Sequence, residues 1–341
     1  MDFHKGRIDS LQALRGIAAL FIILEHVRAF NCGAFGVDIF FCLSGFIMMY
    51  STHKNTKHFL AKRLIRILPL YYLFTLFTFV VMAILPHLFE TSTARPIYLI
   101  KSLLFIPFDI GDGVLQPLMR IGWTVNCEVF FYLLFLIAMK ISHRFRALLA
   151  SAMIVALIAA DTLLQLDFAP LRFYGRAVMF DFVLGFMAYY LAQQIYSRYT
   201  AGKLPKAISA VAYLLAAVLL LWLMINKQGS NIQGLHQPIV WGLPSMVIVL
   251  CFYVGGLHIK PLESLVTLGN ISFSVYFMHY YIVMILDRKV FDFSAFSLST
   301  LCGTALAIFA TVLLSLISYE LIEQRFCHFL RERLLTKSQS E

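Results

Sequence analysis

The sequence predicts an all-α, polytopic membrane protein with about ten transmembrane helices in one bundle and both termini in the cytoplasm. Of its 341 residues, 60% are hydrophobic and 13% are charged, whereas about a quarter of the residues of a soluble protein are charged. The mean hydropathy is +0.81. Apolar stretches close to the roughly 20 residues that cross a bilayer recur along the whole chain, so helices embedded in lipid are the expected architecture.

Ten stretches qualify as spans, with little chain between them. The stretch 97–108 is too short to cross and is expected to be interfacial or re-entrant. We expect one membrane-embedded domain over residues 1–341, with a core of about 8–325 and a short basic tail after it. The predicted spans are 11–30, 34–51, 67–86, 122–139, 147–164, 174–192, 207–226, 239–257, 265–286 and 296–319.

Basic residues predict the orientation of the spans. An even number of crossings leaves both termini on one side, and the loops on that side carry about twice as many Lys and Arg residues as the others. Because cytoplasmic loops are enriched in Lys and Arg, this side is assigned to the cytoplasm. The net charge of +10 then follows from orientation. The basic residues are scattered among apolar segments, so we expect no nucleic-acid partner.

The first span, "LRGIAALFIILEHVRAF" (residues 14–30), keeps Arg15 and His26 in an apolar helix. A charge in hydrocarbon costs roughly 2.5–3.5 kcal/mol on insertion scales. Their separation is about three helical turns, so both side chains share one face about 16 Å apart along the axis. Either each is an orientation charge at one end of the span, or the face lines a cavity or a polar neighbour, with His26 toward the non-cytoplasmic side.

The second span begins with "GVDIFFCLSGF" (residues 36–46), which places Asp38 at a depth similar to that of His26. A carboxylate beside an imidazole can fix its tautomer and raise its basicity. Asp38 could equally cap the start of the helix, and the spacing does not separate the two interpretations. Ser44 and Gly45 are small enough to allow close approach of another helix in mid-membrane.

The third span begins with "KRLIRILPLYY" (residues 62–72), in which Arg63 and Arg66 are three residues apart. This spacing makes them neighbours on one helix face, at the cytoplasmic end of the span. Paired guanidinium groups suit a two-pronged grip on phosphate. The alternative is ordinary anchoring by basic residues at the cytoplasmic surface.

Two further segments bring polar residues into the outer half of the membrane. "WTVNCEVFFYL" (residues 123–133) opens the fourth span, with Trp123 in an interfacial position and Glu128 deeper. "SFSVYFMHY" (residues 272–280) places His279 in the outer half of the ninth span. One ionisable residue at such a depth is weak support for a site, but several at one level predict a polar site inside the bundle.

The ionisable residues therefore form two expected clusters. An anionic donor could dock at the cytoplasmic arginines, and a long thin arm could reach a base about 15 Å deeper. Coenzyme A has this shape, with an anionic nucleotide and an extended pantetheine arm, and the acceptor would then arrive from the outer side. The outer cluster comprises His26, Asp38, Glu128 and His279, and the cytoplasmic cluster comprises Arg15, Arg63 and Arg66.

The chain resembles the acyltransferase-3 family of integral membrane acyltransferases, especially bacterial members that O-acetylate exopolysaccharides or lipopolysaccharide sugars. The Arg-then-His first span, "GVDIFFCLSGF", "KRLIRILPLYY", "WTVNCEVFFYL", "SFSVYFMHY" and "YELIEQRF" are similar to family blocks in the expected order. Where family members commonly read "WSLSVE", this chain reads "WTVNCE" and keeps Glu128. The resemblance implies acyl-CoA, with acetyl-CoA foremost, as the donor. It implies essential roles for the positions that match Arg15, His26, Arg63 and Arg66.

These observations predict a multi-pass O-acyltransferase of the bacterial inner membrane, surrounded by membrane lipid. It would move an acyl group from cytoplasmic acyl-CoA to a sugar hydroxyl of a glycan or lipid-linked acceptor, without a metal. His26 could act as a general base or as a transient acyl carrier. The alternatives are a secondary transporter and a non-catalytic partner of a polysaccharide synthesis machine. We assign His26, Glu128 and Asp38 to catalysis, Arg15, Arg63 and Arg66 to the donor, and His279 and Trp123 to the acceptor.

Overall fold

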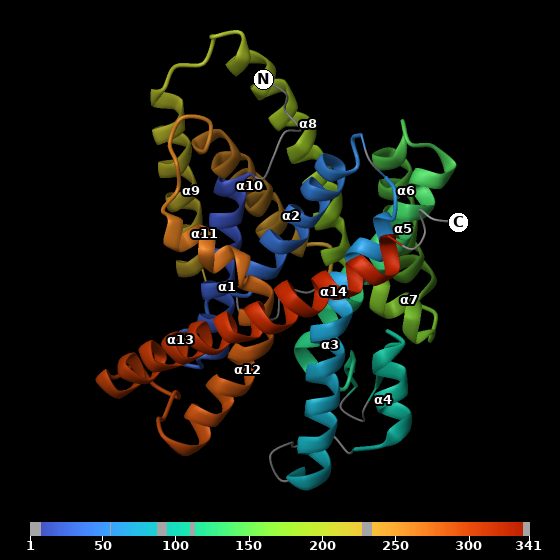
Figure 1. Ribbon diagram of the computed structural model, residues 1–341, viewed down its shortest axis with the longest axis vertical. Helices are drawn as coiled ribbons and strands as arrows, with labels where there is room; N and C mark the ends of the chain where they lie inside the picture. Colours follow the sequence, from blue (N-terminus) through green and yellow to red (C-terminus); the bar gives the residue numbers. More distant parts are fainter. Residues whose placement is uncertain (1–7, 55, 87–93, 110–112, 227–233, 337–341) are drawn as a thin grey trace. The chain divides into compact units, whose positions relative to one another are not determined.

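The computed structural model describes residues 8–54, 56–86, 94–109, 113–226 and 234–336, and these residues are almost entirely helical (Figure 1). Their strands are a single antiparallel pair, β1 (Phe108–Asp109) and β2 (Leu115–Gln116). Helices prevail because a backbone in lipid must satisfy its own hydrogen bonds. Four basic residues that entered the orientation argument lie outside the described residues: Lys5, Arg7, Lys227 and Lys337.

Seven helices in the described residues are long and apolar enough to cross a membrane. An eighth candidate is the pair α11 (Glu263–Asn270) and α12 (Ser272–Lys289), which meet at a 74° bend. The chain is therefore an all-α, multi-pass membrane protein, as predicted. The seven contain α3 (Phe59–Ile84), α5 (Trp123–Ile141), α6 (Arg146–Leu164), α8 (Phe180–Thr200), α9 (Ala207–Ile225), α10 (Leu243–Gly255) and α13 (Leu298–Ser318).

Helices occupy all ten of the predicted spans, although two of them do not qualify as crossings on their own. The first is α1 (Asp9–His26), which carries Asp9, Arg15 and Glu25. The second is α2 (Gly36–Ser51), which has 16 residues and is shorter than the roughly 20 that span the hydrocarbon core. The short stretch predicted at 97–108 contains the eight-residue α4 (Pro96–Leu103). Ten crossings thus stay a prediction for α1 and α2.

The chain divides into two compact units, which are described one at a time. Unit 1 comprises Met1–Thr56 and Phe180–Ile317, and unit 2 comprises Lys57–Met179 and Ser318–Glu341. In unit 1, α1 packs against α2, α10, α11 and α12 (Figure 1). The helix that carries His26 is therefore surrounded by other helices of its own unit.

In unit 1, α2 and α8 cross at a pair of glycines. A Cβ atom on Gly45 would lie 2.2 Å from the carbonyl oxygen of Phe182, and one on Gly185 would lie 2.2 Å from that of Cys42. No larger residue fits at either position without moving the backbone. This contact confirms the expectation that Gly45 allows close approach of another helix, and it fixes the position of the α2 turn that precedes it.

In unit 2, α3 packs on α4 and α5. The buried Tyr71 hydroxyl of α3 lies 2.9 Å from the carbonyl oxygen of Ser102 and 3.2 Å from Oδ1 of Asn126 in α5. Because these polar atoms are buried, each needs a partner inside the protein. The hydroxyl thus joins all three segments. The short α7 (Ala169–Tyr174) packs against α6 in the same unit.

The segment expected to be a short basic tail is helical as far as Thr336. It consists of the π-helix η5 (Tyr319–Phe326), α14 (Cys327–Arg331) and the π-helix η6 (Glu332–Thr336). Within unit 2, α14 packs on α3, and the Cys327 thiol donates to the carbonyl oxygen of Ile65 at 3.2 Å. Cys327 is 1% exposed, so packed structure continues beyond the predicted core boundary of about 325.

Candidate active site

The two histidines predicted at one depth are in direct contact in unit 1. His26 ends α1 and His279 lies within α12. Nε2 of His279 is 3.3 Å from Nδ1 of His26, and the ring centroids are 4.7 Å apart in an edge-on arrangement. His279 is fully buried and His26 is half-buried. The ring of His279 is thus fully covered by protein, whereas the ring of His26 remains partly accessible.

Backbone carbonyl groups fix the tautomers of both rings. Nδ1 of His279 lies 3.1 Å from the carbonyl oxygen of Val275, and Nδ1 of His26 lies 2.9 Å from that of Ile22. Because a carbonyl oxygen only accepts hydrogen bonds, each Nδ1 carries the hydrogen. Nε2 of His279 is then an acceptor facing the Nδ1–H of His26. A neutral His26 therefore has its lone pair on Nε2, the form that can remove a proton.

Two tyrosines restrict the rings further. The ring of Tyr280 is 5.8 Å from that of His26, and the ring of Tyr276 is 5.8 Å from that of His279. Both belong to α12 and flank His279 in the segment "SFSVYFMHY". We did not single out these tyrosines in the sequence, although Tyr276 is three residues from His279 and so shares its helix face.

The turn after His26 is held by its neighbour Glu25. The Glu25 carboxylate accepts hydrogen bonds from the backbone N–H groups of Gly33 at 2.8 Å and Ala34 at 2.9 Å. A Cβ atom on Gly33 would lie 1.7 Å from the carbonyl oxygen of Phe21, so the loop requires glycine there. Glu25 therefore closes the connection between α1 and α2 just beyond the histidine pair.

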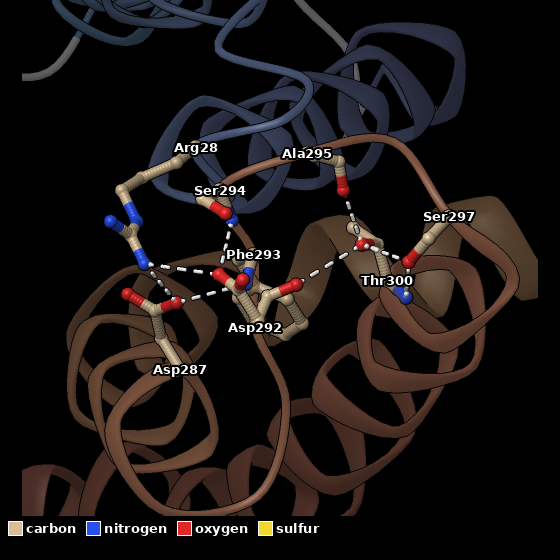
Figure 2. A network of polar contacts seen from close by, with 8 residues as sticks. All are labelled: Arg28, Asp287, Asp292, Phe293, Ser294, Ala295, Ser297 and Thr300. Atoms are coloured by element: carbon tan, nitrogen blue, oxygen red, sulfur yellow. Dashed lines mark hydrogen bonds and ion pairs between the residues drawn. The ribbon is translucent and has the colours of Figure 1, made fainter.

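A second network joins the ends of the two helices that carry the histidines (Figure 2). Arg28 Nη2 donates to Asp287 Oδ1 at 2.8 Å and lies 3.7 Å from Asp292 Oδ1. Asp287 also accepts from the backbone N–H of Phe293 at 3.1 Å, and Thr300 donates to the carbonyl oxygen of Ala295 at 2.6 Å. The network ties the end of α1 to α12 and to the start of α13.

Asp38 does not have the contacts that we expected. Its carboxyl group is fully buried, accepts from Nε2 of Gln237 at 3.2 Å, and lies near the buried carboxyl group of Asp181 in α8. Its side chain does not cap the start of α2 either. His279, rather than Asp38, is the residue that faces Nδ1 of His26, and the catalytic role assigned to Asp38 stays a prediction.

Arg15 lies about three turns before His26 in α1 and is half-buried. Its guanidinium carbon is 6.0 Å from the ring centroid of Phe40 in α2. A guanidinium over an aromatic face is a cation–π contact, which partly compensates for the loss of water around a buried cation. Arg15 belongs to unit 1, whereas Arg63 and Arg66 belong to unit 2. The three arginines of the predicted cytoplasmic cluster are therefore divided between the two units.

In unit 2, Arg63 and Arg66 share one face of α3, as predicted. The charges of Glu128 and Arg331 act on Arg63, and the hydroxyl of the buried Tyr132 donates to Glu128. We did not single out Tyr132 in the sequence, although its four-residue spacing from Glu128 places both on one face of α5. Nor did we single out Arg331, which we counted only among the basic residues that orient the spans.

Trp123 is half-buried at the start of α5. Arg176 lies over its ring, with the guanidinium carbon 5.9 Å from the centroid, and the same group donates to the carbonyl oxygen of Leu115 at 2.9 Å. Arg176 therefore covers the ring that we expected at the interface, and the role of Trp123 in acceptor binding stays a prediction.

The histidine pair inside packed apolar helices defines a class of protein: a membrane-embedded protein equipped for proton transfer or nucleophilic chemistry within the bilayer. Comparison with known proteins identifies the family. The acyltransferase-3 family model, described as an acyltransferase domain, matches residues 8–320. The chain belongs to this family and is an O-acyltransferase. The match contains all the predicted site residues, whereas Arg331 lies beyond it.

Three relatives cover most of this chain. The exopolysaccharide production protein ExoZ of Rhizobium meliloti is 27% identical over 312 residues, which are 90% of this chain and 93% of that protein. The putative membrane-bound transacylase BcsY of Komagataeibacter xylinus is 26% identical over 94% of this chain and 83% of its own. The O-acetyltransferase OatA of Staphylococcus aureus is 24% identical over 82% of this chain and 51% of its own. No solved structure matches.

Proposed function

We propose that this protein transfers an acyl group, acetyl foremost, from cytoplasmic acyl-CoA to a sugar hydroxyl of an exported or cell-surface polysaccharide. The bacterial inner membrane is the proposed location. Family membership supports acyl transfer and favours it over transport or a non-catalytic role. The names of two relatives support the acceptor: one is an exopolysaccharide production protein and another is an O-acetyltransferase.

The observation that carries the proposal is the pair of contacts made by Nδ1 of His26. Its Nδ1–H faces two acceptors, the Ile22 carbonyl and Nε2 of His279, so the lone pair of the neutral ring lies on Nε2. In the proposed reaction Nε2 accepts the proton of the acceptor hydroxyl as the oxygen attacks the thioester carbon. The carbon–sulfur bond breaks, and the coenzyme A thiolate receives the proton from Nε2.

His279 would support this step from the other side of the ring. When His26 becomes an imidazolium, its Nδ1–H is a charged donor, and hydrogen bonds to charged groups are worth about 1.5–3 kcal/mol. His279 accepts this bond because its own hydrogen is directed to Val275. This is a positioning role, and the acceptor-binding role assigned to His279 from the sequence stays a prediction.

The arginines of α3 are the proposed docking site for the phosphates of the donor. Arg63 and Arg66 lie side by side on one face, and planar guanidinium groups bind phosphate oxygens through paired hydrogen bonds. Glu128, which accepts from Tyr132, contributes a carboxylate to the same cluster. Its negative charge acts on Arg63 and supports a role in orienting that guanidinium group, and Arg15 would add a positive charge in unit 1.

The test is a His26→Ala variant supplied with labelled acetyl-CoA and acceptor polysaccharide. We expect transfer to fall by at least about 100-fold, the usual contribution of a positioned general base. The matched control is His236→Ala, which removes an exposed histidine of unit 1. Normal acetylation by His26→Ala would overturn the catalytic assignment. Wild-type protein recovered with the acetyl label attached to His26 would identify an acyl carrier instead of a base.

A further inference from the structure

The helical segment after the family match packs onto the turn of α3 that carries the two arginines. Cys327 is buried, and its thiol contacts the carbonyl oxygen of Ile65, which stands between Arg63 and Arg66. Both η5 and α14 pack against α3 within unit 2. The position of this segment on α3 is therefore fixed at Cys327.

Arg331 follows Cys327 by one helical turn and shares its face of α14. Its charge acts on Arg63, and together with that of Arg66 it acts on Cys327. Arg331 is exposed, whereas the two arginines of α3 are half-buried. Arg331 thus lies on the face of α14 that packs on the turn of α3 between Arg63 and Arg66.

Carboxylates accompany the three arginines. Glu128 acts on Arg63, and Glu323 acts on Cys327. These groups offset part of the positive charge. Mutual repulsion among the arginines is relieved further when an anion binds between them. Coenzyme A carries three phosphate groups, two in its diphosphate and one on its ribose. A pair of arginines on one helix and a third on another helix suits this division.

We propose that Arg331 completes a three-arginine phosphate site with Arg63 and Arg66 and binds the ribose phosphate of coenzyme A. The inference rests on the proposed function, because it takes acyl-CoA as the donor. It adds a determinant of donor specificity: the site distinguishes coenzyme A from dephospho-coenzyme A, which lacks only the ribose phosphate. The phosphate of an anionic lipid offers the same chemistry and is the competing source.

The experiment measures binding of coenzyme A and dephospho-coenzyme A to the full-length protein in nanodiscs of zwitterionic lipid. One charged hydrogen bond is worth about 1.5–3 kcal/mol, so the wild type should prefer coenzyme A by about tenfold or more. Arg331→Gln should abolish most of this preference, and Arg331→Lys should keep part of it. The matched control is Arg333→Gln, an exposed arginine of the same segment that lies over Phe329.

The outcomes separate the inference from the function on which it rests. If the wild type binds coenzyme A and transfers acetyl groups, yet Arg331→Gln keeps the preference, the inference is wrong and the proposed function stands. If the wild type neither binds coenzyme A nor uses acetyl-CoA, both are wrong. The lipid alternative is tested in nanodiscs that contain phosphatidylglycerol. If Arg331→Gln binds less of this lipid than the wild type but keeps the preference for coenzyme A, the site belongs to a lipid headgroup and the inference is overturned. An Arg331→Gln melting temperature equal to the wild type's excludes misfolding.

Discussion

Replacing His279 with phenylalanine should slow acyl transfer while leaving the fold in place. Phenylalanine keeps an aromatic ring in a position that is fully buried among apolar neighbours. It removes Nε2, which is 3.3 Å from Nδ1 of His26. It also removes the donor to the Val275 carbonyl, but that oxygen lies within a helix and keeps its backbone partner.

The expected size of the effect follows from the acceptors of His26. Its Nδ1–H faces the Ile22 carbonyl at 2.9 Å and Nε2 of His279, so His279→Phe leaves one acceptor of two. The neutral tautomer is therefore retained, and the loss falls on the imidazolium formed during transfer. One hydrogen bond to a charged group is worth about 1.5–3 kcal/mol, which corresponds to a kcat reduced by roughly 10- to 150-fold.

The assay is steady-state acetyl transfer by purified protein, with the donor and the acceptor varied separately. We expect the fall in kcat, whereas KM for acyl-CoA should stay unchanged because the arginine pair is intact. His279→Gln is the informative partner variant, because its amide oxygen can accept from His26 at a similar reach. It should recover most of the lost rate, which a purely structural defect would not do.

A His279→Phe protein with wild-type kcat would contradict this prediction, since the acceptor would then contribute nothing to the reaction. Variants His279→Gln and His279→Phe that were equally slow and equally stable would contradict it as well. In that case the ring of His279, and not its acceptor nitrogen, would be the feature that matters.

Two further predictions concern the carboxyl groups of unit 1. Asp181→Asn should leave the melting temperature in detergent unchanged or raise it, because the neutral amide keeps the shape of the side chain and removes a second buried carboxyl group next to Asp38; a clear loss of stability would contradict this. Hydrogen bonds from the hydroxyl and the backbone N–H of Ser294, and the charge of Arg28, hold the pKa of Asp292 below its usual 3.8. Its contacts are therefore complete above that pH and are lost only as the pH falls through the lowered pKa. Protection of the Ser294 amide, corrected for intrinsic exchange, should be equal at pH 8 and pH 5, and a loss by pH 5 would disprove the contact.

Hydropathy predicted the helices well because the apolar composition of each span follows from its own position in the membrane and does not depend on which other spans it contacts. All ten predicted stretches are helical, and the segment 97–108 is indeed short. The bend between α11 and α12 could not be predicted, since the stretch 265–286 is apolar on both sides of it. The division into two units depends on contacts between distant segments, which composition does not encode.

The depth of the site residues in the membrane could be predicted from the sequence, but the direction of each side chain around its helix axis could not. Counting residues along a span places His26, Asp38 and His279 near one level, but it leaves open which neighbouring helix each side chain faces. We therefore expected Asp38 to be a partner for His26, whereas it accepts from Gln237 and lies near Asp181. Arg331 was missed for a different reason. A basic residue near a membrane surface has a common explanation in orientation, and only its packing next to α3 gives it another.

The hydrogen-bonded chain from His26 through His279 ends at a carbonyl oxygen, and this ending has a consequence for the whole reaction. A carbonyl cannot pass a proton onward, so His279 is a terminus and not a relay. A proton taken up at Nε2 of His26 has to depart from that same atom, toward the coenzyme A thiolate. Acyl transfer by this route is thus a closed proton cycle that draws on neither side of the membrane. Its turnover should be indifferent to the proton gradient across the bilayer.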